Sequence, residues 1–475
     1  MGRLFLQAVI IVCSILIVMH LVFWQGYDSI FLIICNLICV AIAGILLMSK
    51  NLIFNPLFFL FLTLLASVLL RSYFLVYSDD VYVLDYLRLN ENVTSFIWPS
   101  IILLLGLMSF MLCFTLFQPR LFTMARNFSS SIWVKWKVDL LIWVLFGISL
   151  TSLIVFLKYS GISGFDSLLQ NISKKRYFVV EGSDWATSLG YLRLLISLSE
   201  LAFYILIIDT FQYKRKFTMP RTALIFGLGF INVFFPLFSS SRSSLLIFFL
   251  NLFIILVLYN RLNLKLFTLG VVGSFFLIIA ITSLRAKKQD ANYSLYNLIE
   301  KVAVNRNMLG ISKTAHIING VPHKIDYKYG STMVSWVYAP IPRSVWPQKP
   351  NVSVGKEVGT AIFDAKRNSY SGGSGVPPGI IAELFINFGS VGVIVLMGIF
   401  GIIYKTLFFQ FPLVINSALD PNNVLFYLLL VLNLAYVFFG GSVSQTAIDF
   451  LAKIAPTLVF VKLISRKGTY IDLVR

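Results

Sequence analysis

The sequence predicts an all-α polytopic membrane protein. Of its 475 residues, 58% are hydrophobic and only 12% are charged, and the mean hydropathy is +0.86. A soluble protein carries roughly twice that charged fraction. Apolar runs of about 20 residues, the length that crosses a bilayer as a helix, recur along most of the chain. We therefore expect about twelve transmembrane helices.

The predicted helices fall into two blocks that are separated by one long polar segment. Residues 1–284 carry nine helices with short loops, residues 285–379 form the large loop, and residues 380–475 carry three more helices and a tail. The first apolar run has no small-residue cleavage site, so we expect it to stay as the first helix. The predicted runs are 4–23, 29–48, 54–76, 97–117, 139–157, 188–210, 222–238, 243–259, 266–284, 380–404, 423–439 and 446–464.

The short loops predict the orientation. Residues 118–138 and 211–221 each contain four Lys or Arg and no acid. Short cytoplasmic loops carry an excess of Lys and Arg, so this pattern places both termini on the cytoplasmic side of the membrane. The loop 285–379 then lies on the opposite, extracytoplasmic side; in a bacterium of the kind that the resemblance below implies, this is the periplasmic side of the inner membrane.

That long loop is strongly basic, although it lies on the side where the rule predicts less positive charge. It holds thirteen Lys or Arg against five Asp or Glu. The net charge of the chain, +19, is otherwise explained by the cytoplasmic loops, so it does not indicate nucleic acid. A basic surface outside the bilayer predicts an anionic partner, and a lipid phosphate or diphosphate is the obvious one.

Three arginines are candidates for binding such an anion. Arg242 lies in the serine-rich turn Ser239–Ser244 between two short apolar runs, where free N–H groups and hydroxyls favour a phosphate. The alternative is an arginine that reaches the lipid headgroups. Arg285 ends the apolar run before the loop and could equally be an ordinary basic flank. Arg343 lies in the proline-rich run Pro340–Pro350, which cannot be helical.

Two neighbours of Arg343 extend that candidate site. Trp346 offers a flat face for a sugar ring or an acyl chain, and Lys349 could share the anion. The rigid prolines are expected to fix Arg343 close to Trp346, and an arginine binds phosphate oxygens in a bidentate manner. The alternative for the whole run is a packing motif within the loop.

The candidate proton acceptors are His316, His323 and Glu383. Residues 294–318 place apolar side chains and then Arg306, Lys313 and His316 at helical spacing, so this segment is expected to form a helix whose stripe ends in cations. Either histidine could remove a proton from a sugar hydroxyl. Glu383 lies near the outer end of a predicted helix, where an ionisable group is costly and indicates a function. Its alternative role is to hold the loop to the helix.

Metal and nucleotide chemistry have little support in the sequence. Asp79 and Asp80 could hold a divalent ion beside a phosphate, but no further acidic cluster accompanies them. The four cysteines all lie in apolar runs and show no disulfide or zinc spacing. A nucleotide-binding phosphate loop is missing from the sequence, so an activated lipid-linked donor is expected to supply the energy. No cofactor and no bound metal are expected.

Several of these segments resemble the O-antigen polymerase (Wzy) family of oligosaccharide repeat-unit polymerases. The resemblance rests on Pro340–Pro350, Gly372-Gly373, Pro377-Pro378 and Ala382–Gly389. The Ser-Arg-Ser at 241–243 is similar to a turn in these polymerases and in the related O-antigen ligases. The predicted topology fits the family over nearly the whole chain.

The resemblance implies a metal-independent GT-C glycosyltransferase that polymerises undecaprenyl-diphosphate-linked repeat units during lipopolysaccharide synthesis. It also implies a repeat-unit flippase and a chain-length regulator as partners. On this basis, Arg242, Arg285, Arg343, Trp346, Lys349 and His323 are expected to bind the diphosphate and glycan, and Glu383 or His316 is expected to act as the base. The alternatives are an O-antigen ligase, a lipid-linked oligosaccharide flippase, and a metal-dependent enzyme that uses Asp79 and Asp80.

Overall fold

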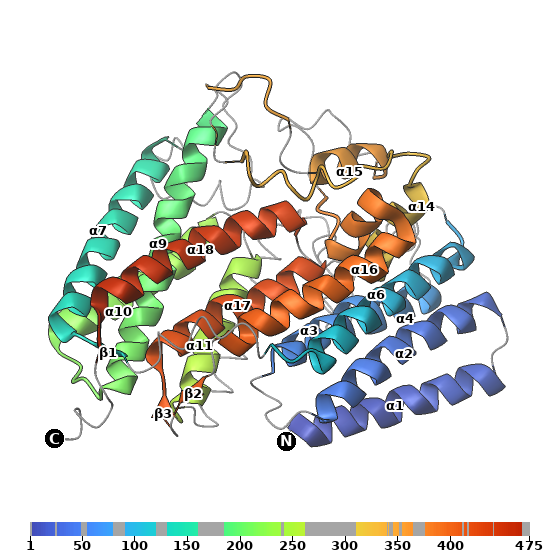
Figure 1. The fold of residues 1–475 in the computed structure, drawn as a ribbon, viewed down its shortest axis with the longest axis horizontal. Coiled ribbons are helices and arrows are strands. Elements are labelled where there is room, and N and C mark those ends of the chain that lie inside the picture. Colours follow the sequence, from blue (N-terminus) through green and yellow to red (C-terminus); the bar gives the residue numbers. More distant parts are fainter. Residues whose placement is uncertain are drawn as a thin grey trace, which may run out of the picture. The chain divides into compact units, whose positions relative to one another are not determined.

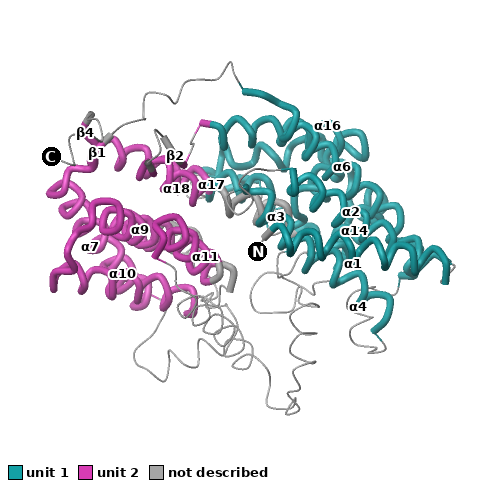
Figure 2. The backbone as a smooth tube through the Cα atoms, turned by 90° about the horizontal axis from the view of Figure 1, so that it is seen from below, with its two compact units in different colours: residues 1–122, 294–409, 430–449 teal, residues 123–293, 410–429, 450–475 magenta. Residues whose placement is uncertain are grey.

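A computed structural model describes most of the chain, and its helices form two compact units (Figure 1, Figure 2). Each unit gathers segments that are far apart in the sequence. Unit 1 consists of residues 1–122, 294–409 and 430–449, and unit 2 of residues 123–293, 410–429 and 450–475. The described residues are 2–23, 26–48, 55–78, 91–119, 131–159, 185–238, 242–261, 310–339, 341, 345–350, 354–363, 376–410, 413–415, 418–439 and 441–467.

Unit 1 is built on long apolar helices with two short helices from the large loop. Helix α1 packs against α2, and α2 packs against α6, which in turn contacts α14. The buried core of this unit draws on all of these helices, including Phe31, Phe61, Phe110 and Ile317. The elements are α1 (Gly2–Val22), α2 (Tyr27–Leu47), α3 (Pro56–Leu64), α4 (Arg71–Tyr77), α6 (Ile97–Leu116), α14 (Ile311–Gly320), α15 (Gly355–Ala361) and α16 (Ile380–Gln410).

The third span of unit 1 is interrupted near its middle. Between α3 and α4 the backbone forms a π-helical segment, η1 (Leu65–Leu70), so the three elements together make one span, Pro56–Tyr77. A π-helical turn widens a helix and is frequent at functional sites. Arg71 is the first residue after this turn and is almost fully buried.

Helix α16 is bent at Gly389, which has φ +64° and ψ −160°. This backbone conformation favours glycine, because a Cβ atom would be strained there. The bend divides α16 into a short N-terminal part, in which Ile380–Asn387 are buried, and a longer part that contacts α6. Ser109 Oγ on α6 donates a hydrogen bond to the carbonyl of Ile394, at 2.7 Å.

Close contact between α6 and α16 requires glycine at position 401. A Cβ atom at Gly401 would overlap the carbonyl oxygen of Phe110 and press on Cys113. We expect Gly401→Val to lower the stability of unit 1 by roughly 2 kcal/mol, since an overpacked contact forces the helices apart. Thermal unfolding in detergent measures this loss. Gly44→Val is the matched control, because a Cβ atom at Gly44 meets nothing within 4 Å; equal midpoints for the two variants would contradict the expectation.

Unit 2 is a second helical bundle. Helix α9 packs against α7, α10 and α11, and α10 also contacts α7 and α11. Residues 421–429 of α17 and 450–464 of α18 also belong to this unit, and the other residues of these two helices belong to unit 1. The elements are β1 (Ser131–Trp133), α7 (Lys135–Tyr159), α9 (Trp185–Gln212), α10 (Met219–Phe238), α11 (Arg242–Leu258), β2 (Val414–Ile415), β3 (Ala418–Leu419), α17 (Pro421–Phe439), α18 (Val443–Ile464) and β4 (Ser465–Lys467).

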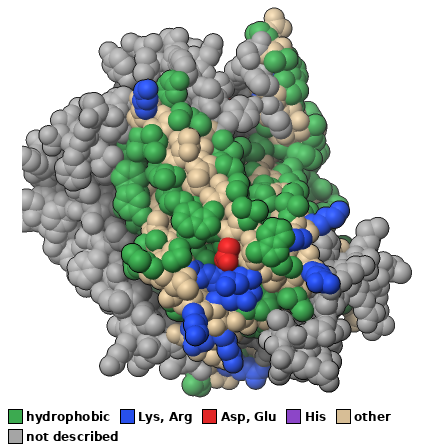
Figure 3. All heavy atoms as spheres, turned by 90° about the vertical axis from the view of Figure 1, so that its left-hand side faces the viewer, with side chains coloured by type: hydrophobic (Ala, Val, Ile, Leu, Met, Phe, Trp, Pro, Cys, Tyr) green, Lys and Arg blue, Asp and Glu red, His purple; other side chains and the backbone are tan. Residues whose placement is uncertain are grey.

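Positive charge gathers at one end of unit 2. Strand β1 precedes α7 and pairs antiparallel with β4, which follows α18. The start of α7 therefore lies beside the end of α18. Figure 3 shows that most Lys and Arg side chains of this face gather in its lower half, beside an acidic side chain and below a largely apolar surface. At this end Arg221 donates to Asp209 at 2.5 Å and to Asp139 at 3.1 Å, which ties α10 to α9 and α7.

The helical membrane architecture predicted from the sequence is confirmed. Eight described helices are long and apolar enough to cross a membrane, and they match eight of the predicted runs. Three further runs, 243–259, 423–439 and 446–464, form α11, α17 and α18. The predicted run 266–284 lies outside the described residues.

Candidate functional site

The centre of the candidate site is α14, a ten-residue helix from the large loop that is buried in unit 1. Its predicted helical stripe extended over 294–318, and the described part begins at Ile311. Ile311, Ala315 and Ile318 recur at helical spacing and join the core of the unit. The polar residues Lys313 and His316 are nevertheless also buried. A short helix that buries a lysine and a histidine has an unusual polar load, which indicates more than packing.

Lys313 lies beside Arg71, and both side chains are buried, with exposed fractions of 6% and 3%. The chain at Gly310 presses directly on Arg71, since a Cβ atom there would overlap the arginine side chain and the Ser67 carbonyl. The Lys313 ammonium donates to the carbonyl of Pro377. Burial, and then the charge of Arg71, lower the pKa of Lys313 well below its ordinary value. Two cationic side chains thus meet at the end of a membrane span.

His316 lies one turn further along α14 and faces Glu91. Its Nδ1 atom is 3.7 Å from Glu91 Oε1, and its ring packs edge-on against Phe96 and Phe363. Asn319, on the same helix, donates to the other Glu91 oxygen at 3.2 Å. A carboxylate beside one ring nitrogen orients an imidazole, and an oriented imidazole is a common general base. The arrangement is therefore suited to a general base.

Glu91 should make the stability of this region depend on pH. The neighbouring His316 lowers the pKa of the Glu91 carboxyl, although partial burial opposes the shift. A carboxyl whose pKa is lowered in the folded state stabilises the protein above the pKa of the unfolded state, and this contribution is lost as the pH falls through the folded value. We expect Glu91→Gln to lower the thermal midpoint at neutral pH and to match the wild type at acidic pH. Midpoints recorded across an acid pH series test this; a constant gap would contradict it.

Glu383 is fully buried and both of its carboxylate oxygens are engaged. Thr332 Oγ1 donates to Oε1 at 2.8 Å, and the backbone N–H of Val443 donates to Oε2 at 2.5 Å. Val443 is the first residue of α18, so the carboxylate caps that helix. Asn387 donates to Thr332 at 2.8 Å, and it accepts from the N–H of Gly330. These contacts favour a structural role, in which Glu383 holds the loop 328–335 to α16 and α18.

The structure places His323 in the turn that directly follows α14, and Trp346 and Lys349 further along the large loop. His323 is exposed. Trp346 is partly exposed and packs edge-on against Tyr338. Lys349 donates to the carbonyls of Ala339 and Ile341, at 2.7 and 2.8 Å, which closes the proline-rich loop on itself. This bonding favours a structural role for Lys349; the described part of the loop, 345–350, is not helical, as expected.

The predicted arginines stay predictions. Arg285 and Arg343 lie outside the described residues, as do Asp79 and Asp80. Arg242 begins helix α11, as expected for a residue at a helix end, but its side chain is outside the described part.

Sequence reasoning missed Arg71 and Glu91. Arg71 lies within the apolar run 54–76, and an ionisable residue inside a membrane span is itself a signal of function. Glu91 lies shortly before the predicted run 97–117, and only the fold brings it to His316. Proximity across 225 residues of chain leaves no periodic pattern in the sequence.

Comparison with known proteins decides the family. The family model described as O-antigen polysaccharide polymerase Wzy matches residues 6–464, nearly the whole chain. The chain belongs to the O-antigen polysaccharide polymerase Wzy family. The search of curated proteins and the search of solved structures each give no match. Membership in the Wzy family confirms the resemblance noted in the sequence, and it assigns the chain to O-antigen polymerisation in a membrane.

Within this Wzy protein, unit 1 brings four of the described polar groups together. Arg71, Glu91, Lys313 and His316 come from a membrane span, the start of the next span, and one loop helix. The set combines two cations with a histidine and a carboxylate. Such a set can bind a doubly or triply charged anion and accept a proton nearby.

Proposed function

We propose that this Wzy protein transfers a growing glycan from undecaprenyl diphosphate to the terminal sugar hydroxyl of a new lipid-linked repeat unit, on the periplasmic face of the bacterial inner membrane. The observation that carries this proposal is the buried pair Arg71 and Lys313, beside His316 and Glu91, at one end of the spans of unit 1.

The buried cations favour a diphosphate as ligand. Taking a lysine and an arginine out of water side by side costs free energy, and an anion between them recovers it. Burial and the charge of Arg71 both disfavour the Lys313 ammonium, and a bound diphosphate would reverse the second effect and oppose the first. Arginine binds phosphate oxygens through two parallel hydrogen bonds, and lysine adds a point charge.

The chemistry follows from these positions. The oxygen of the acceptor hydroxyl attacks the anomeric carbon of the donor sugar, and His316, oriented by Glu91, takes the hydroxyl proton. The bond between that carbon and the diphosphate oxygen breaks, and the electron pair leaves with the diphosphate. Arg71 and Lys313 stabilise the charge that develops there, which is commonly the largest contribution to catalysis. A direct attack inverts the anomeric carbon, and fixed cations allow a metal-independent, GT-C-type reaction.

The charge distribution supports the orientation. The exposed Lys135, Lys214, Lys216, Arg261 and Lys462 lie at helix ends that topology places on one side of the bilayer. This side is the cytoplasm by the positive-inside rule. Alternation of the spans of unit 1 then puts Arg71, Glu91 and α14 on the periplasmic side, where a flippase would deliver substrate and a chain-length regulator would act.

Deletion of the gene, followed by gel analysis of surface polysaccharide, tests the proposal. We expect the ladder of long chains to collapse to a single repeat unit attached to the lipid core, and the gene in trans to restore it. Free polymer that is not attached to the core would indicate a ligase instead. Loss of even the single repeat unit would indicate a flippase.

A further inference from the structure

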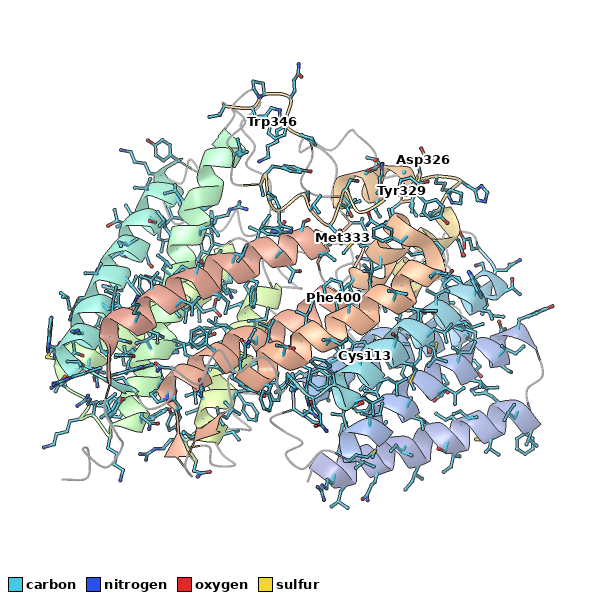
Figure 4. All side chains as sticks on the ribbon, in the orientation of Figure 1. Cys113, Asp326, Tyr329, Met333, Trp346 and Phe400 are labelled. Atoms are coloured by element: carbon cyan, nitrogen blue, oxygen red, sulfur yellow. The ribbon has the colours of Figure 1, made fainter. Side chains whose placement is uncertain are left out.

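A short part of the large loop carries exposed apolar side chains although it is held firmly in place. Tyr329 is 80% exposed, Val337 61% and Val334 56%, and Trp336 is also exposed. Beneath them, Thr332 donates to Glu383 and the N–H of Gly330 donates to Asn387, both on α16. Figure 4 shows Tyr329 and Met333 beside the N-terminal part of α16. The exposed side chains therefore stand on a fixed backbone.

The depth of this segment relative to the bilayer can be read from α16. The helix has 31 residues and is roughly 46 Å long, which exceeds the hydrocarbon thickness of about 30 Å. Its first eight residues are buried in unit 1. An exposed apolar stripe then begins and continues at helical spacing through Phe388, Val391, Val395, Ile399 and Ile403. The edge of the hydrocarbon therefore lies near Phe388.

The loop crosses α16 at that edge. A Cβ atom at Gly330 would lie 3.1 Å from the Phe388 ring, and the N–H of Lys328 donates to the carbonyl of Ile386 at 3.0 Å. Tyr329 therefore lies next to Gly330, which contacts Phe388, the first residue of the exposed stripe. Trp and Tyr are enriched at this level of membrane proteins, because one part of the ring is apolar and the other polar.

We propose that residues 329–337 lie in the headgroup region of the bilayer and contact lipid through Tyr329, Val334, Trp336 and Val337. The segment is then an interfacial anchor and not a freely solvated part of the loop. Residues 321–328 join this segment to α14, and Met333 packs against the same hydrophobic core as α14. The anchor thus helps to hold the helix of Lys313 and His316 at the membrane surface, where the phosphates of a lipid-linked substrate lie.

The test uses the full-length protein in nanodiscs with an environment-sensitive NBD label. Val337→Cys and Val334→Cys carry the label in turn, and the native cysteines, which are buried or half-buried, are replaced. We expect NBD at these two positions to emit at shorter wavelength than NBD in aqueous solution. Its emission should be quenched strongly by a nitroxide on the lipid headgroup and weakly by iodide. His323→Cys, at an exposed polar position of the same loop, is the matched control and should show the reverse.

Two results would overturn the proposal. If labels at 334 and 337 behave as the label at 323 does, the segment faces water. If they are shielded from both quenchers, the segment is covered by protein. The outcome does not depend on the glycosyl-transfer reaction, so a failure here leaves the proposed function untouched, and an inactive protein can still place these labels in lipid.

Discussion

Arg71→Gln is expected to abolish long glycan chains while leaving single repeat units on the lipid core. The substitution keeps a polar side chain of similar length but removes the positive charge of Arg71, which we expect to stabilise the leaving diphosphate. Loss of one preorganised group that stabilises transition-state charge lowers the rate by roughly a hundredfold or more. The measurement is the distribution of chain lengths in a deletion strain complemented with each variant.

Two matched variants serve as controls for Arg71→Gln. Arg71→Lys keeps the charge and should retain part of the ladder, although it loses the bidentate geometry. Arg193→Gln makes the same change in a span of unit 2, where the exposed Arg193 lies over the Phe156 ring; we expect a wild-type ladder. Membrane levels of each variant are compared by immunoblot. A normal ladder from Arg71→Gln at a normal level would exclude Arg71 from the site.

Two substitutions of Glu383 distinguish a structural role of this side chain from a catalytic one. Glu383→Gln can still accept from the N–H of Val443 and donate to Thr332, so we expect a stable protein with substantial polymerase activity. Glu383→Ala removes both hydrogen bonds and leaves a buried N–H without its acceptor. That loss and the cavity together cost about 3 kcal/mol. Thermal unfolding in detergent and the glycan ladder measure the two effects.

The opposite pattern would identify Glu383 as the base. In that case Glu383→Gln would keep the thermal midpoint and lose the ladder, because an amide cannot accept the hydroxyl proton. Thr332→Val, which removes one of the same hydrogen bonds without touching the carboxylate, controls for a general loosening of the loop. We expect it to lower the midpoint less than Glu383→Ala does.

The sequence was most informative about the membrane helices. Apolar length is a local property, so the runs that became α1, α2 and α6 could be located without knowledge of the fold. The sequence does not predict the bend in α16, because a glycine within an apolar run does not reveal whether its φ is positive, as it is at Gly389. The π-helical turn before Arg71 was equally invisible, since Leu65–Leu70 reads as ordinary apolar helix.

The candidate site could be predicted only in part. His316 was found because a histidine in a basic loop is a rare and chemically specific residue. Its partner Glu91, and Arg71 beside Lys313, reach α14 because that helix packs against Val93–Phe96 and α4. Such long-range packing leaves no local pattern in the sequence. Lys349 illustrates the converse: its position beside Arg343 indicated an anion, and its ammonium instead bonds two carbonyls of its own loop.

Binding of undecaprenyl diphosphate to the purified protein in nanodiscs tests the central claim most directly. The account predicts that the wild type binds the diphosphate more tightly than undecaprenol, and that Lys313→Met weakens binding by roughly tenfold or more, the value of a charge-assisted hydrogen bond. The half-buried Lys405 in α16 provides the control variant Lys405→Met, which should bind as the wild type does. Equal affinity of the wild type and Lys313→Met for undecaprenyl diphosphate would contradict the account.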